Sequence, residues 1–288
     1  MSNSLYKGYD PKTLQRLHDV QVQMLKDVLR VCDKYSIPCF LIYGTAIGAV
    51  RHGGFIPWDD DIDVGMLRED FDKFCEIFPR ELYHDYELLT PLIDNRYACT
   101  VCHVQKKGTT FISEVSKDLK CHLGIFMDIF PFDGVPDRVG DQKKLLRKTT
   151  FYGKLLFLSG TGNPHIPYTG MLYHILHLGC LIIHFLLKIF HVTPDKLYRK
   201  FLKACTLYND KQCEYVTSYE YTGSIKDKIK KEDLFPLKKV PFESIEAYIP
   251  NNNDEFLTKV YGEYMSVPPE SKRINHAPLV IKFENNMD

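Results

Sequence analysis

The sequence lacks an excess of charge of either sign, since Lys plus Arg and Asp plus Glu are 37 each among 288 residues. A neutral chain does not have the basic surplus that binds a nucleic-acid backbone, so we expect no nucleic-acid partner. The sequence also has no Gly-Lys-Ser/Thr phosphate loop, no Gly-x-Ser-x-Gly turn and no His-Glu-x-x-His motif. These absences exclude three common catalytic signatures, so catalytic chemistry has to come from other residues.

The nine cysteines lack the regular spacing of a disulfide framework, and their number is odd. We therefore expect reduced thiols and a cytoplasmic protein. The stretch 1–9 is polar and has no apolar centre, which is not typical of a signal peptide. Cys99 and Cys102 lie three residues apart in a predicted strand, where they face opposite sides, so ordinary buried thiols are favoured over a metal site.

The most informative stretch has four acids within residues 59–63, directly after the only tryptophan, Trp58. From Asp61 the pattern alternates, with Asp61 and Asp63 on one side and apolar residues on the other, as in a half-buried strand. Two neighbouring carboxylates repel each other unless a cation lies between them. Oxygen ligands on a rigid strand suit Mg²⁺ or Mn²⁺, so the pattern predicts a metal site.

A phosphate site is predicted just upstream of these acids. The short apolar strand 41–43 leads into Gly44 and Thr45 at the start of a short helix. Such a helix start exposes backbone N–H groups and a hydroxyl, which bind phosphate. Arg51 and His52 follow at the far end of the same helix.

These residues carry a family resemblance. Gly-Thr, a short helix and an Asp-x-Asp strand resemble the core of the polymerase-β-type nucleotidyltransferases. The longer string 43–63, with Arg-His-Gly-Gly-Phe-Ile-Pro-Trp-Asp-Asp-Asp-Ile-Asp in its second half, resembles the LicD family more specifically. That family includes bacterial phosphocholine transferases and fukutin-like proteins. The resemblance continues at 128–131, Asp-Ile-Phe-Pro, and from Tyr261 to His276, so it covers both ends of the chain and is weaker between them.

The resemblance implies a third acid on a neighbouring strand, and Asp128 in the apolar stretch 123–131 matches it. A carboxylate inside an interior strand has to be paired, hydrogen-bonded or metal-bound. The alternative is a structural Asp that caps a turn at Pro131. Asp133 is interpreted as part of an Asp-Gly turn.

The resemblance also implies a function: metal-dependent transfer of a phospho-alcohol, with phosphocholine favoured, from a CDP-alcohol such as CDP-choline. The acceptor would be a hydroxyl of a cell-surface glycan precursor or lipid-linked oligosaccharide, and CMP would be released. Asp61, Asp63 and Asp128 would be catalytic. The expected ligands of Mg²⁺ or Mn²⁺ are Asp59, Asp61, Asp63 and Asp128. The residues expected to bind the donor and its phosphates are Gly44, Thr45, Arg51, His52, Trp58, Arg273 and His276.

Two other functions use the same acids. A nucleotidyltransferase would move a nucleoside monophosphate from a triphosphate to a small molecule or sugar phosphate. A calcium module would use Asp59, Asp61, Asp63 and Asp70 at the first, third, fifth and twelfth positions of an EF-hand-like loop. Val64 stands where such a loop needs Gly, which disfavours the calcium interpretation.

The predicted fold is α+β, with a nucleotidyltransferase-like mixed sheet flanked by helices and a helical insertion. The periodicity predicts helices over 10–35 and 68–78, and strands over 86–90, 98–104, 109–113 and 123–131. We divide the chain into a core with an N-terminal helix (1–139), a helical insertion facing membrane or acceptor (140–210), and an α+β segment (211–288) that returns to the active-site cleft.

Two segments leave alternatives open. The strongly apolar stretch 171–190 follows the basic segment 143–148. It is interpreted as a buried helix, as a helix lying in the plane of a membrane at the inner face of the cell, or as a transmembrane span, which Gly179 and several polar side chains disfavour. The tail with Arg273 and His276 either returns to bind the donor or is solvated.

Overall fold

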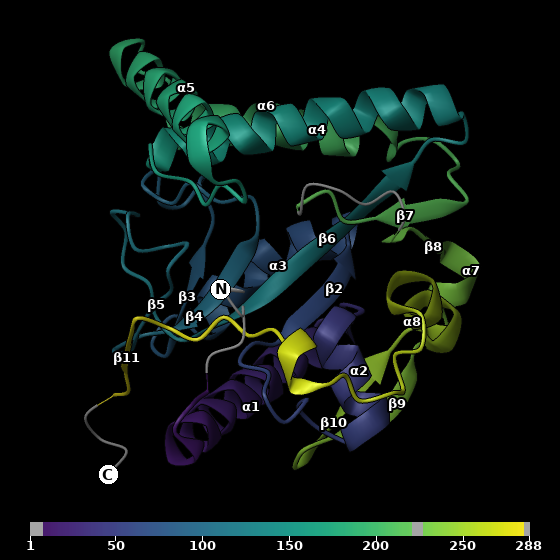
Figure 1. Cartoon of the computed structure of the whole chain (residues 1–288). Coiled ribbons are helices and arrows are strands. Elements are labelled where there is room, and N and C mark those ends of the chain that lie inside the picture. Colours follow the sequence, from purple (N-terminus) through teal and green to yellow (C-terminus); the bar gives the residue numbers. More distant parts are fainter. Residues whose placement is uncertain (1–7, 221–226, 285–288) are drawn as a thin grey trace.

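A mixed sheet of seven strands forms the centre of the computed structural model, which describes residues 8–220 and 227–284 (Figure 1). Only the β2–β6 pair is parallel among the strand pairs of the described residues. Helices precede the strands of this sheet, connect them and follow them along the chain. This combination of helices with a mixed sheet confirms the predicted α+β class. The strands of the sheet are β1 (Phe40–Leu41), β2 (Asp63–Leu67), β6 (Phe126–Val135), β4 (Cys102–Lys106) and β3 (Tyr86–Leu89), extended by β7 (Tyr215–Thr217) and β8 (Ile229–Lys230).

Helix α1 (Pro11–Lys34) confirms the first predicted helix. The side chain of Asp10 caps it by accepting a hydrogen bond from the backbone N–H of Thr13 at 2.9 Å. Its apolar face is buried in the main core beside the sheet. The other helices around the sheet are α2 (Tyr43–His52), α3 (Arg68–Glu81), α7 (Lys231–Leu234) and α8 (Asn253–Tyr261).

Several predicted boundaries are wrong. Tyr43 already belongs to α2, α3 continues through Pro79 into its last turn, and the strand expected from residue 98 begins only at Cys102. The largest difference is β6, which runs past Pro131 to Val135. Proline fits there because β4 pairs with β6 only up to residue 129 and β7 pairs with it only from residue 133.

Asp133 therefore lies in a strand and not in the predicted turn. Its carboxylate accepts hydrogen bonds from Nε and Nη2 of Arg68 at 2.9 and 2.7 Å, and one from the amide of Asn209 at 2.7 Å. Glu220 lies 3.8 Å from the same guanidinium, and burial raises the pKa of Glu220 to about 7. All three charged side chains are buried, so this cluster ties α3 to the far end of the sheet.

Three helices form a separate layer at the top of Figure 1, on the far side from α1 and α2. They are α4 (Val139–Gly160), α5 (Gly170–Ile189) and α6 (Pro194–Cys205). α4 and α6 share a small core that includes Leu156 and Phe201. α5 projects beyond them and has no buried residue, so the buried-helix interpretation of 171–190 is wrong.

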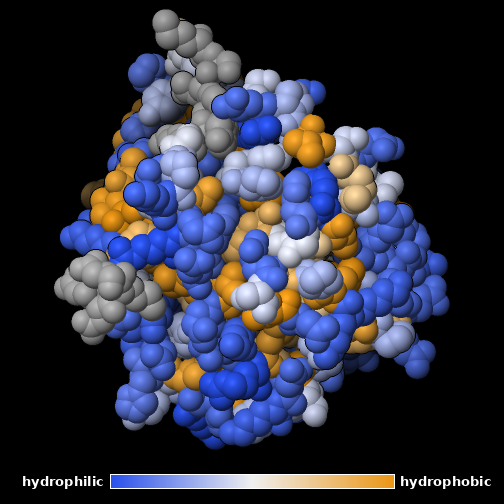
Figure 2. Space-filling view, turned by 90° about the horizontal axis from the view of Figure 1, so that it is seen from below, coloured by the Kyte–Doolittle hydropathy of each residue, from blue (hydrophilic) through white to orange (hydrophobic). Residues whose placement is uncertain are grey.

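The remaining strands form two small sheets. β9 (Lys238–Phe242) and β10 (Ile245–Ile249) make a hairpin beside α2. β11 (Val280–Lys282) pairs with β5 (Thr110–Ile112), so the last described residues cross the molecule from α8 to the opposite side (Figure 1). Seen from below, away from the helical layer, the surface is mostly hydrophilic with smaller hydrophobic areas between (Figure 2).

Candidate functional site

The register of three neighbouring strands brings two of the predicted acids together with a histidine. Asp63 on β2 stands opposite Asp128 on β6, and His103 on β4 stands opposite Asp128 from the other side. Residues opposite each other in paired strands project to the same face of a sheet. One face therefore carries a row of Asp63, Asp128 and His103 at the beginning of β2 and β6.

His103 is a site residue that the sequence did not reveal. Its Nε2 lies 3.0 Å from Oδ1 of Asp128. The imidazole stacks on Phe126 with ring centroids 4.4 Å apart and meets Tyr97 edge-on. The ring is therefore fixed by packing while one nitrogen faces the carboxylate. Only the register of β4 against β6 shows this contact, since 25 residues separate His103 from Asp128 in the chain.

The first turn of α2 lies directly against the acids. The backbone N–H of Asp63 donates to Oγ1 of Thr45 at 2.8 Å, and the carbonyl of Asp63 accepts from Ile42 at 3.1 Å. A Cβ on Gly44 would lie 3.0 Å from Oδ2 of Asp59, so the absence of a side chain lets this carboxylate approach the helix. The predicted Gly-Thr element thus positions two of the acids. The N-terminus of α2 also carries the positive end of the helix dipole, which favours negative charge beside it.

Crowding of the carboxylates is the main electrostatic feature of the site. Burial, followed by the charges of Asp61 and Asp60, raises the pKa of Asp59 well above its usual range. Burial, followed by the charges of Asp61 and Asp128, does the same for Asp63. Such a set of like charges is destabilising unless positive charge lies among them. The donor set therefore fits a divalent cation.

Asp60 has a different role from its neighbours. It is buried and accepts hydrogen bonds from the hydroxyl of Tyr9 at 2.6 Å and from the backbone N–H of His276 at 2.8 Å. Sequence alternation predicts that Asp60 points away from the metal site. In the structure it fastens both the N-terminal segment and the C-terminal tail to the acid stretch.

His276 brings a nitrogen to the same place. Its Nδ1 lies 3.1 Å from Oδ2 of Asp61, and its hydrogen bonds to Asp60 and Asp61 raise its pKa to about 11. Ligand atoms of Asp60, Asp61 and His276 lie within 4.8 Å of one another, a group that could hold a metal ion. The tail is therefore attached to the acid stretch and is not free in solvent.

The other predicted donor-binding residues also meet the tail. The guanidinium of Arg51 donates to the backbone carbonyl of Tyr264 at 2.5 Å and to Nε2 of His52 at 3.0 Å. The guanidinium of Arg273 lies over the ring of Trp58, 4.2 Å from its centroid. Arg51 thus holds the tail in this structure, and its contact with donor phosphates stays a prediction.

Two other metal-site interpretations find no support. Asp63 begins a strand and Asp70 lies in α3, so residues 59–70 do not form an EF-hand-like loop, and the calcium module is wrong. The nine cysteines are all free, and burial raises the pKa of both Cys99 and Cys102. These raised pKa values agree with the prediction of ordinary thiols at both positions.

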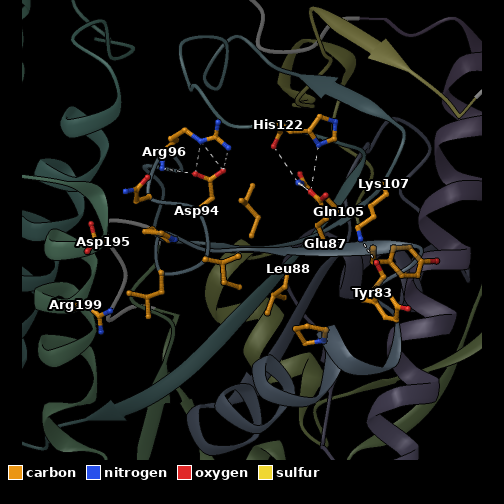
Figure 3. A pocket seen from close by; sticks show the side chains of 17 residues that line it. Tyr83, Glu87, Leu88, Asp94, Arg96, Gln105, Lys107, His122, Asp195 and Arg199 are labelled. Atoms are coloured by element: carbon orange, nitrogen blue, oxygen red, sulfur yellow. Dashed lines mark hydrogen bonds and ion pairs between the residues drawn. The ribbon is translucent and has the colours of Figure 1, made fainter.

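A concavity of about 860 Å³ lies elsewhere, between the edge of the sheet and the helical layer (Figure 3). Glu87 of β3, Arg96 of the following loop and Arg199 of α6 are among its lining residues. Arg96 is paired with Asp94, and Gln105 donates to Glu87 at 3.0 Å. None of the four predicted metal ligands lines it, so this concavity is separate from the acid cluster.

Comparison with known proteins bears directly on this site. Residues 36–156 match the family model described as LicD/FKTN/FKRP, nucleotidyltransferase domain. The chain carries a LicD-family domain. The matched range contains α2, the acid stretch 59–63, His103 and Asp128. The resemblance seen in the sequence is thereby confirmed.

Similar proteins extend the match beyond this domain. The chain is 29% identical over 276 residues to the lipopolysaccharide cholinephosphotransferase LicD of Haemophilus influenzae, covering 92% of this chain and 96% of that protein. An uncharacterized protein of Rickettsia typhi is 43% identical over 111 residues, which cover 38% of this chain and 33% of that protein. An uncharacterized protein of Rickettsia prowazekii is 35% identical over 80 residues, 28% of each chain.

Proposed function

We propose that this LicD-family chain is a transferase that moves a phospho-alcohol, phosphocholine being favoured, from a CDP-alcohol to a hydroxyl of a glycan. The observation that carries the proposal is the row of Asp63, Asp128 and His103 beside the first turn of α2. It lies inside a domain matched by the family model. The similarity to a lipopolysaccharide cholinephosphotransferase along nearly the whole chain supports phosphocholine as the group transferred.

The carboxylates Asp59, Asp61, Asp63 and Asp128 would hold Mg²⁺ or Mn²⁺. The raised pKa values of Asp59, Asp63 and His276 support this assignment, because all three indicate a surplus of negative charge at the site. When bound, the cation would offset the charge of the diphosphate and of the departing CMP.

The remaining chemistry belongs to the residues of this chain. The acceptor oxygen forms a bond to the phosphorus that carries the alcohol, the bond from that phosphorus to the bridging oxygen breaks, and CMP leaves with the electron pair. The hydroxyl proton passes to Asp128, whose carboxylate faces Nε2 of His103 at 3.0 Å. The first turn of α2, at Gly44 and Thr45, would bind donor phosphate through its N–H groups.

The acceptor proposed here is a glycan or lipid-linked oligosaccharide, and the enzyme would work in the cytoplasm at the inner face of the membrane. The relative named for lipopolysaccharide supports an acceptor of this class.

A panel of CDP-alcohols tests the proposal. CDP-choline, CDP-ribitol and CDP-glycerol would each be incubated with the purified chain, Mg²⁺ and a phosphocholine-free lipopolysaccharide acceptor. We expect CMP release from at least one of them, fastest from CDP-choline. Pyrophosphate release from nucleoside triphosphates, with all CDP-alcohols left intact, would instead support the nucleotidyltransferase alternative.

Replacing His103 by Leu tests the role proposed for this residue. Partners that orient a metal-binding carboxylate usually contribute ten- to a hundredfold to metal affinity or activity. We therefore expect H103L to lower kcat by about ten- to a hundredfold and to raise the Mg²⁺ concentration needed for half-maximal rate, with the donor KM little changed. H103Q, which can still donate to Asp128, should recover part of the loss. Equal activity of H103L and wild type would exclude the role.

A further inference from the structure

Helix α5 exposes a continuous apolar stripe. Six residues at alternating spacings of four and three are each at least 50% exposed, which places them on one face of the helix. They are Met171, Ile175, Leu178, Ile182, Phe185 and Ile189. A row of this length on one helix exceeds the scattered apolar residues that an ordinary surface carries. It therefore requires a partner that is itself apolar.

The opposite side of α5 is fixed to the protein. His177 lies 2.9 Å from the amide oxygen of Asn163, and Nδ1 of His184 lies 2.6 Å from the carbonyl of Leu158 in α4. These histidines are seven residues apart and share a face of the helix. α5 is long and apolar enough to cross a bilayer. Its attachment along one side instead leaves only the other face for an outside partner.

The helical layer formed by α4, α5 and α6 carries a large positive charge, and the rest of the chain carries an equal negative charge. Residues 139–205 carry ten Lys and Arg, two Asp and no Glu, a formal charge of +8. Since the whole chain is neutral, the other residues carry −8. All ten basic side chains are exposed. They are Lys143, Lys144, Arg147, Lys148, Lys154, Lys188, Lys196, Arg199, Lys200 and Lys203.

These two observations identify one kind of partner. A bilayer with anionic headgroups offers hydrocarbon for the stripe and negative charge for the exposed basic residues of the same helical layer. A second copy of this chain could cover the stripe, but it would bring another surface of charge +8 against the first. We infer that α5 lies in the plane of an anionic lipid surface, with its stripe inserted and with exposed basic residues of the helical layer interacting with the headgroups.

Vesicle flotation of the full chain, without any CDP-alcohol, tests this inference independently of the proposed function. We expect binding to mixed phosphatidylcholine–phosphatidylglycerol vesicles and much weaker binding to phosphatidylcholine alone. F185N removes one inserted aromatic ring and should weaken binding about tenfold or more. The pair K143Q/K144Q should weaken binding to the mixed vesicles several-fold, as should added salt.

The control is V115N, which makes the same kind of change at a side chain of similar exposure, 57% against 62% for Phe185, outside the helical layer. It should bind as wild type does, and so should D63N. Flotation of F185N equal to that of wild type would overturn the inference. A wild-type protein that binds no vesicles but forms dimers, which the F185N substitution dissociates, would also overturn it. So would vesicle-bound protein that resists extraction with alkaline carbonate, because such resistance is typical of a transmembrane helix.

Discussion

Replacing Asp63 by Asn is expected to lower the rate of CMP release from the CDP-alcohol on the order of a thousandfold, because a proposed ligand of the catalytic cation is lost. The same change should raise the thermal unfolding temperature of the metal-free protein. Burial and the charges of Asp61 and Asp128 disfavour the ionised form of Asp63, and Asn removes that cost. Steady-state kinetics and thermal denaturation of one protein preparation measure both effects.

The matched control is D60N, three residues earlier in the same acid stretch. Asp60 accepts hydrogen bonds from Tyr9 and from the backbone of His276, so its replacement should destabilise the protein by about 1–3 kcal/mol. Opposite changes in stability at positions 60 and 63 are therefore expected. Wild-type turnover by D63N would show that Asp63 does not hold the catalytic cation.

Replacing Arg68 by Met is expected to destabilise the protein by about 3–5 kcal/mol, which is a large fraction of the stability of a typical domain. The change leaves Asp133 and Glu220 buried without their cation, and both side chains have no exposed surface. Urea denaturation followed by circular dichroism measures the loss.

Two further variants support the interpretation of that loss. R80M removes an arginine that is 73% exposed and pairs with Glu76 one helical turn away, so its effect should stay below about 0.5 kcal/mol. R68M combined with D133L removes both partners and should recover part of the stability. A loss from R68M no larger than that from R80M would mean that the buried pair does not stabilise the fold.

Local patterns predicted the elements that carry the acids. The cap at Asp10 and the helical periodicity after it gave α1, and the alternation from Asp61 identified β2. Gly44 and Thr45 were predicted at a helix start, and they lie in the first turn of α2. These features depend on neighbouring residues in the chain, which is why the sequence alone was enough.

Features that depend on long-range pairing could not be predicted in this way. His103 faces Asp128 only because β4 pairs with β6 in one register. Asp133 and Gly134 have the composition of a turn, but Arg68, 65 residues away, and strand β7 hold them in β6. The sequence also did not decide whether α5 is buried or exposed, because an apolar helix in a core and an apolar helix at a membrane have similar sequences.

Phosphorus NMR of a mixture of the purified chain, Mg²⁺, CDP-choline and a lipopolysaccharide acceptor tests the proposed transfer most directly. We expect the diphosphate signals to decline while CMP and a new phosphodiester on the glycan grow in equal amounts, and we expect a chelator to stop all three changes. Diphosphate signals that persist with wild-type enzyme, or CMP that forms at an undiminished rate after chelation, would contradict a metal-dependent phospho-alcohol transferase.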